Sequence, residues 1–328
     1  MKILIIGGAG MVGRKLAEKL ASDGRLGKNE ISAMTLYDVV PPVKPAGAKM
    51  PVVLRTGDLP AAGESDKLVA DKPDVIFHLA AIVSGEAELE FDKGYRINML
   101  GTHNLLESVR HAYEKAAKKP RVVFTSSIAV FGAPFPEKIY DEFIHAPLTS
   151  YGTQKAIGEL LLSDYTRKGM LDGIGIRLPT VCVRPGRPNK AASGFFSNIM
   201  REPLAGQEAV LPVSDDVMHW HASPRAAVGF LQHAALIDGE KVGTRRSLTM
   251  PGLAATIGEQ IAALKRIGGD KVVQRIRREP DPFVQKIVAG WPRNFDARRA
   301  TALGFKSEAT FDEILKVHIE DELGGKIT

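Results

Sequence analysis

The sequence contains a single cysteine, Cys182, among its 328 residues. One cysteine excludes an internal disulfide and is typical of proteins from a reducing compartment. No apolar run approaches the roughly 20 residues that a transmembrane helix needs. The apolar start at Ile3–Ile6 is too short, and too soon followed by glycine, for a signal peptide. We therefore expect a cytoplasmic protein that has no membrane partner.

A long basic segment is also missing, although the formal net charge is +6. The basic residues are scattered, with short groups such as Lys118–Lys119 and Arg275–Arg278. Proteins that bind nucleic acid usually concentrate such residues on one arm or face. The charge therefore predicts no nucleic-acid partner, and it suits an anionic small substrate and cofactor instead.

The first motif is a glycine-rich turn that follows the N-terminal apolar run. Gly7, Gly10 and Gly13 have the spacing G-x-x-G-x-x-G between a predicted strand and a predicted helix. Glycines at this spacing let the backbone approach a pyrophosphate at the helix N-terminus, so the turn predicts a dinucleotide site. Asp38 ends a second predicted strand about 25 residues later. An acid there binds the adenine ribose and favours NAD over NADP, although Asp38 can also be an ordinary turn residue.

Alternating strand and helix patterns predict an α/β fold with a doubly wound parallel sheet. From Arg184 the sequence changes to a basic loop rich in glycine and proline. We therefore expect an NAD-binding domain of residues 1–183, completed by about 215–250, and a smaller C-terminal substrate lobe of residues 184–214 and 251–328. In this lobe we expect helices near 253–266 and 309–322 and a strand at 271–276. Before the change, residues 86–118 carry long helical patterning.

A tyrosine and a lysine are the strongest chemical signal in the chain. Helical spacing of the apolar residues places Tyr151 and Lys155 one turn apart on the same face. An ammonium about 5 Å away, at an effective dielectric of about 20, lowers the pKa of a phenol by about two units. Such a tyrosine can act as a base near neutral pH. The alternative is an ordinary core helix that carries both residues.

Taken in order, these motifs resemble the extended short-chain dehydrogenase/reductase family over nearly the whole chain. The resemblance implies a Rossmann sheet, NAD as the cofactor, and Ser127, Tyr151 and Lys155 as the catalytic residues. Tyr151 would be the acid/base, Lys155 would lower its pKa and hold the nicotinamide ribose, and Ser127 would orient the substrate. A homodimer is implied as well, paired through helices around 98–116 and 157–165. The residues that the resemblance assigns to NAD are Gly7, Gly10, Met11, Val12, Gly13, Asp38, Asp58, Leu59, Leu79, Ala80, Ala81, Asn98, Tyr151, Lys155, Thr180 and Val181.

Within this family, the segment Leu178–Lys190 lacks the asparagine-tyrosine-glycine-proline pattern that is usual in nucleotide-sugar epimerases. Together with Arg201–Leu204 and Gly290–Pro292, it resembles NAD-dependent members that act on a four-carbon sugar acid. We therefore expect oxidation of a carbon 2 hydroxyl to a keto group, with Tyr151 as the base and NAD as the hydride acceptor. A substrate carboxylate calls for arginine or backbone amides. The candidate substrate contacts are Ser84, Ser127, Tyr151, Arg184, Arg187 and Asn189.

Two other functions remain open. A nucleotide-sugar 4-epimerase or dehydratase would recycle its NAD within each turnover. A non-catalytic NAD-binding sensor or scaffold is the other alternative, although such proteins can lose the active tyrosine and this chain retains Tyr151. His219 and His221 are expected on one face of a strand, but a metal site would need further ligands, so we expect none. His78 and Cys182 are expected to be packed residues.

Overall fold

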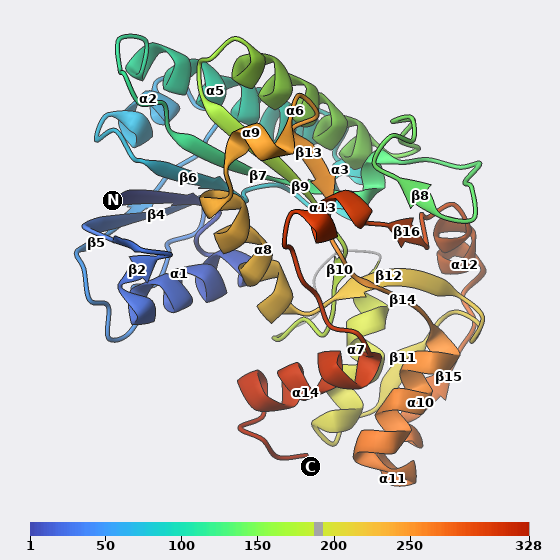
Figure 1. Cartoon of the computed structure of the whole chain (residues 1–328). Helices are drawn as coiled ribbons and strands as arrows, with labels where there is room; N and C mark the ends of the chain where they lie inside the picture. The colour runs from blue at the N-terminus through green and yellow to red at the C-terminus, as the bar shows by residue number, and fades with distance from the viewer. Residues whose placement is uncertain (187–192, 328) are drawn as a thin grey trace.

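The computed structural model describes residues 1–186 and 193–327, and its centre is a seven-stranded sheet (Figure 1). The strand order is β13-β9-β7-β6-β1-β4-β5, and every neighbouring pair runs parallel. This confirms the doubly wound parallel sheet. The strands are β1 (Lys2–Ile6), β4 (Ala33–Asp38), β5 (Val52–Thr56), β6 (Val75–His78), β7 (Arg121–Ser127), β9 (Asp172–Leu178) and β13 (Ser247–Thr249).

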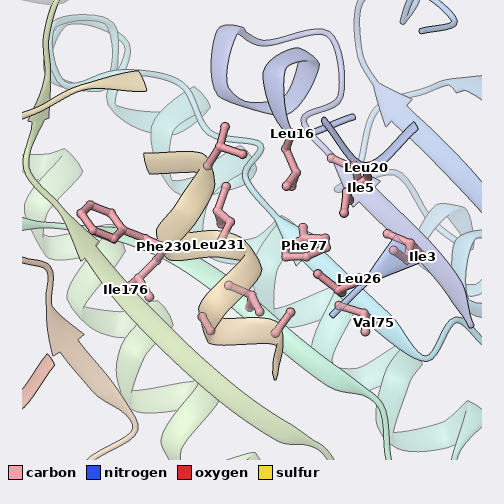
Figure 2. Packing of buried hydrophobic residues seen from close by; sticks show 14 of the residues in the cluster. Ile3, Ile5, Leu16, Leu20, Leu26, Val75, Phe77, Ile176, Phe230 and Leu231 are labelled. Carbon is pink, nitrogen blue, oxygen red and sulfur yellow. The ribbon is translucent and has the colours of Figure 1, made fainter. Parts of the chain in front are cut away.

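Helices cover both faces of this sheet because its inner strands are apolar on both sides. Along β1, Ile3 and Ile5 face α1 (Met11–Asp23) and α8 (Pro224–Leu236), and Leu4 and Ile6 face the opposite layer. Figure 2 shows Leu16 and Leu20 of α1 and Leu231 of α8 around Phe77 of the sheet. The opposite layer consists of α2 (Glu64–Val69), α5 (Gly101–Ala112) and α6 (Ser150–Arg167). Each fully buried side chain of this size contributes about 1.5–3 kcal/mol.

The connection between β6 and α5 differs from the long helix that the sequence patterning predicts. The chain forms α3 (Ser84–Leu89), α4 (Phe91–Gly94) and a π-helical segment η1 (Tyr95–Leu100) before α5 begins. The helix breaks at Glu90, whose backbone angles of φ −116° and ψ 70° are not helical. Asn98 of η1 accepts a hydrogen bond from the Ile82 N–H (2.9 Å) and donates to the Ile82 carbonyl (3.2 Å). These bonds tie the broken helix to the end of β6.

A second hydrophobic core lies in the C-terminal part of the chain, where α7 (Gly194–Leu204), α10 (Ile257–Gly268) and α14 (Phe311–Glu322) pack together. A three-stranded sheet of β10 (Thr180–Val181), β12 (Met218–Ala222) and β14 (Leu253–Thr256) covers it on the side of the large sheet. Figure 1 shows these elements below and beside the main sheet. The fold thus has the smaller lobe that was expected, whereas the exact domain boundaries stay a prediction.

Two expectations inside this lobe are wrong in detail. The predicted strand at 271–276 is instead α11 (Asp270–Val273) followed by β15 (Ile276–Arg278), which pairs with β11 (Ala209–Leu211). Gly269, with φ 79°, separates α10 from this short helix, whose first residue is an acid. The predicted helix at 253–266 begins only at Ile257, because residues 253–256 pair with β12 and Thr256 caps α10.

The remaining elements are short. They are β2 (Arg25–Leu26), β3 (Asn29–Glu30), η2 (Ile128–Val130), β8 (Ile139–Tyr140), α9 (Gly239–Val242), α12 (Pro282–Ala289), β16 (Phe295–Asp296) and α13 (Arg298–Ala302). Within residues 1–186 and 193–327, no helix has the length and apolar character that crossing a bilayer demands.

Candidate functional site

A cavity of about 420 Å³ lies at the carboxyl ends of the central strands. The glycine turn after β1, Leu79 after β6, Ser127 of β7 and Leu178 of β9 form one side of it. His219 of β12 and Trp291, which comes from the distant C-terminal part, lie on the other side. The carboxyl edge of an open parallel sheet is where such folds bind ligands. The lobe therefore covers this edge and turns it into a cavity.

The glycine turn is shaped for an anion. Gly7 has φ 95°, and Gly10 occupies the N-cap of α1, so this position contributes no side chain over the free helix amides. A Cβ on Gly13 would lie 2.1 Å from the Gly7 carbonyl oxygen. The backbone can pack this closely only with glycine at that position. The turn thus fits the pyrophosphate of a dinucleotide, which would lie at the N-terminus of α1.

The cavity brings together most of the residues that the sequence assigned to NAD. Its lining includes Gly7, Gly10, Met11, Val12, Gly13, Leu79, Ala81, Tyr151, Lys155, Thr180 and Val181. Among the described residues, the lining does not include Asp38, Asp58, Leu59, Ala80 or Asn98.

Asp38, Asp58 and Asn98 already have protein partners. Asp38 accepts a hydrogen bond from the Ala9 N–H (2.9 Å) and so supports the glycine turn, whereas Asp58 pairs with Arg96 (2.5 Å). Besides its bonds to Ile82, the amide of Asn98 donates to the Gln154 side chain (2.7 Å). Asn98 therefore supports the segment after β6 from behind, and the predicted contacts of the two aspartates with the adenosine stay predictions.

Ser127, Tyr151 and Lys155 lie together on one wall of the cavity. Thr149 caps α6 by accepting a hydrogen bond from the Gly152 N–H (3.1 Å), which starts the helix immediately before Tyr151. The Lys155 ammonium lies 5.7 Å from the centroid of the Tyr151 ring and donates to the Thr125 carbonyl (2.7 Å). Strand β7 thus fixes the lysine, and its last residue, Ser127, lies beside the tyrosine.

The expected low pKa of Tyr151 is wrong for this arrangement. Burial raises the pKa of Tyr151 to about 12, and hydrogen bonding by Ser127 and the charge of Arg184 oppose this rise. The same burial lowers the pKa of Lys155 to about 7, although Glu159 opposes that shift. The low pKa predicted for Tyr151 took account of the attraction between the phenolate and the ammonium. It did not include the cost of removing each charge from water, which is the larger effect here.

Two further candidate substrate contacts come from α3 and from the loop after β10. Ser84 and Arg184 both line the cavity. The Arg184 guanidinium donates to the Val181 carbonyl (3.0 Å) and to the Ser193 hydroxyl (2.9 Å), and burial lowers its pKa. These bonds fix the guanidinium at the cavity wall. Arg187 and Asn189 lie outside the described residues.

His219 and Trp291 also line the cavity, although neither was predicted to be a site residue. Their rings lie 5.4 Å apart, and His219 stacks on Phe196 at 5.1 Å. The Nε2 atom of His219 lies 2.7 Å from the Thr180 hydroxyl, and burial lowers the His219 pKa to about 3, so the ring is neutral. The alternation His219-Trp220-His221 was the available signal for His219. Trp291 belongs to the segment Gly290–Pro292 that contributes to the family resemblance, but its place in the cavity depends on the tertiary fold.

His78 and Cys182 are packed residues, as expected. His219 and His221 share one face, with rings 5.6 Å apart, and the described residues contain no group of side chains suited to hold a metal ion. His78 is buried with its Nε2 atom 2.8 Å from the Thr102 hydroxyl. Burial raises the pKa of the Cys182 thiol to about 12, which makes it a poor nucleophile.

Comparison with known proteins adds the family context. The model of the "NAD dependent epimerase/dehydratase family" matches residues 3–221. A D-erythronate dehydrogenase of Cupriavidus necator is 45% identical over 98% of both chains, and one of Haemophilus influenzae is 41% identical over 98% of this chain and all of its own. A crystal structure described as a nucleoside-diphosphate-sugar epimerase from Agrobacterium tumefaciens is 64% identical. It covers all of this chain and 96% of its own, with a TM-score of 0.98.

The close backbone approach at Gly13 yields a test of the turn. We expect Gly13→Ala to weaken NADH binding at least about tenfold, because the new methyl group forces the turn away from the N-terminus of α1. The measurement is a titration of NADH fluorescence. Gly229→Ala in α8 is the matched control, since its Cβ meets open space, and it should leave binding unchanged. Equal NADH affinity in both variants contradicts the assigned role of the turn.

Proposed function

The chain belongs to the NAD dependent epimerase/dehydratase family, and we propose that it oxidises the carbon 2 hydroxyl of D-erythronate to 2-keto-D-erythronate with NAD. The two D-erythronate dehydrogenases that match along almost the whole chain support this substrate. The observation that carries the proposal is the wall of Ser127, Tyr151 and Lys155 with Arg184 beside it. This wall offers a base, a hydroxyl to orient the substrate and a cation for its carboxylate.

The glycine turn and the N-terminus of α1 would hold the pyrophosphate, and Thr180 and Val181 would border the nicotinamide. NAD supplies the hydride acceptor, and its nicotinamide ring carries a positive charge. The Ser127 hydroxyl orients the substrate hydroxyl toward the Tyr151 Oη atom, which takes its proton. The Thr125 carbonyl holds Lys155 next to this pair.

The pKa values of Tyr151 and Lys155 show that the phenolate needs positive charge nearby. The pKa of Tyr151 is raised to about 12 and the pKa of Lys155 is lowered to about 7, so the neutral pair is favoured over the phenolate–ammonium pair. Positive charge near Tyr151 shifts this balance toward the phenolate, and Arg184 supplies part of it. The phenolate form of Tyr151 is therefore most populated when cationic groups fill the site. This dependence suits a dehydrogenase that acts only when its oxidised cofactor is bound.

Arg184 is the proposed carboxylate contact. Its guanidinium is held by the Val181 carbonyl and Ser193 at the lobe end of the cavity. A planar guanidinium with several donors can bind a carboxylate while retaining these bonds. Ser84 at the start of α3 is the proposed contact for a distal hydroxyl of the substrate.

The nucleotide-sugar epimerase remains the second candidate, since the solved relative from Agrobacterium tumefaciens carries that description. Against it stands the departure from the epimerase pattern at Leu178–Lys190. The homodimer, the cytoplasmic location and the absence of a nucleic-acid partner stay predictions. Leu100 of η1 and Leu160 of α6 are exposed on the helices that a dimer would pair.

The reaction is tested by following NADH absorbance at 340 nm with NAD and a panel of four-carbon sugar acids. We expect NADH to form fastest with D-erythronate. UDP-glucose is assayed in parallel, and its products are analysed. The appearance of UDP-galactose without net NADH would show that the chain is an epimerase. Binding of NAD without turnover of either class would favour the sensor.

Tyr151→Phe tests the base. We expect kcat to fall at least about 1,000-fold while NADH affinity stays within about twofold, because the ring remains and the proton acceptor is lost. Tyr165→Phe is the control, since Tyr165 lies on the same helix and its hydroxyl donates to Glu107, away from the cavity. Near-normal turnover in Tyr151→Phe overturns the assigned mechanism.

Arg184→Gln tests the carboxylate contact. We expect KM for D-erythronate to rise about 10- to 100-fold, since one charge-assisted contact is lost. The acid limb of the kcat/KM profile should also move to higher pH, because Arg184 lowers the pKa of Tyr151. Arg293→Gln, an exposed neighbour of the Trp291 wall, is the control. An unchanged KM in Arg184→Gln assigns the carboxylate to another group.

A further inference from the structure

Behind the catalytic wall, α6, β9 and the segment after β8 share a buried ionic cluster. The Arg177 guanidinium of β9 donates to both carboxylate oxygens of Glu159 on α6, at 3.0 and 2.9 Å, and to Asp141 at 3.1 Å. The side chains of Arg177, Glu159 and Asp141 are 5%, 3% and 1% exposed. Burying three charges costs free energy that apolar side chains of similar size would avoid. Stability alone therefore does not account for the cluster.

The cluster contacts the catalytic wall at the end of β7. The Ser126 hydroxyl donates to the Glu159 carboxylate at 2.5 Å. Ser126 lies between Thr125, whose carbonyl accepts from the Lys155 ammonium, and Ser127. Glu159 also follows Lys155 by four residues on α6, so both side chains lie on the same helix face. Glu159 is thus linked to Lys155 through the strand and faces it along the helix.

We infer that Glu159 is a positioning residue that favours the ammonium form of Lys155 within the buried site. This inference rests on the proposed function, because the charge of Lys155 matters for the reaction only if Tyr151 is the base. Arg177 and Ser126 hold the Glu159 carboxylate in place, and the carboxylate offsets part of the desolvation of the ammonium.

The groups around Lys155 support this assignment. Tyr151 faces it from the same helix, the Phe124 ring lies 4.8 Å from its ammonium, and His78 faces it from β6. Burial lowers the pKa of His78 to about 3, so that ring carries no charge near neutral pH. Burial also lowers the pKa of Lys155, and the charge of Glu159 is what raises it again.

The groups that contact the Glu159 carboxylate are consistent with its acting on Lys155. Arg177 and Ser126 bind it, and His145, from the segment after β8, lies 3.6 Å from its carboxylate. Burial lowers the pKa of His145, which keeps this ring mainly neutral. Asp141 is bound by Arg177 and lies 3.4 Å from Arg299 on its outer side. Glu159 is therefore the carboxylate of the cluster that lies along α6 from Lys155.

Glu159→Gln removes a negative charge next to Lys155 and leaves the positive charge of Arg177 uncompensated there, so the pKa of Lys155 should fall. The ammonium form is then lost at a lower pH than in the wild type. A charge one helical turn away shifts a buried pKa by about one to two units. Turnover should therefore fall at lower pH on the alkaline side of the profile, with a larger change in kcat than in KM.

The experiment measures the titration of the Lys155 amine in the absence of substrate. The rate of its acetylation by acetic anhydride is followed against pH by peptide mass spectrometry, since only the free amine reacts. We expect the midpoint of the Lys155 titration to lie about one to two pH units lower in Glu159→Gln than in the wild type. Glu107→Gln is the control. Glu107 of α5 also accepts hydrogen bonds from an arginine and a tyrosine, Arg110 and Tyr165, but it contacts α6 at the end opposite Tyr151. It should leave the midpoint unchanged.

The pH profile of kcat with NAD and D-erythronate completes the test. The alkaline limb should move to lower pH in Glu159→Gln, and Glu159→Asp, which restores the charge, should return it most of the way. If Glu159→Gln does not fold, the comparison of Glu159→Asp with the wild type replaces it, with a smaller shift in the same direction. Equal acetylation midpoints in all folded variants overturn the inference. A wild type that does not oxidise D-erythronate overturns the proposed function, whereas the acetylation result stands independently.

Discussion

The cost of burying ionisable groups beside one another is the constraint on which this molecule depends. Tyr151 and Lys155 lie on α6 against the end of β7, away from bulk water, and burial favours the neutral form of each. A base in this position needs compensating charge from its surroundings. Arg184 from the lobe and Glu159 from the helix itself both act on this pair. The chemistry is thus supported by residues from several elements.

The architecture supplies these residues because two hydrophobic cores meet at the carboxyl edge of the sheet. The core around β1, α1 and α8 fixes the glycine turn, and the core of α7, α10 and α14 fixes the lobe. Residues from both therefore line one cavity, including Gly7 on the sheet side and His219 on the lobe side. Neither core would form the cavity alone, since an open sheet edge has only one wall.

Several features of the site could not be predicted from the chain. The pKa of Tyr151 moves opposite to the expectation because desolvation depends on how the lobe covers α6. Asn98 supports the segment after β6 from behind, since a π-helical segment turns its amide toward Ile82 and Gln154. Trp291 reaches the cavity from a position more than 100 residues beyond Tyr151. Each of these outcomes depends on contacts between segments distant in the sequence.

Local sequence patterns were enough to predict the parallel sheet, the glycine turn and the pairing of Tyr151 with Lys155. Hydrophobic periodicity and the conformational freedom of glycine act over a few residues, so they can be read from neighbouring positions. The protonation balance of the tyrosine and lysine, the ionic cluster behind them and the lobe wall of the cavity all depend on tertiary contacts. Those features depend on burial and on charges brought together from different elements, and local patterns carry no record of either.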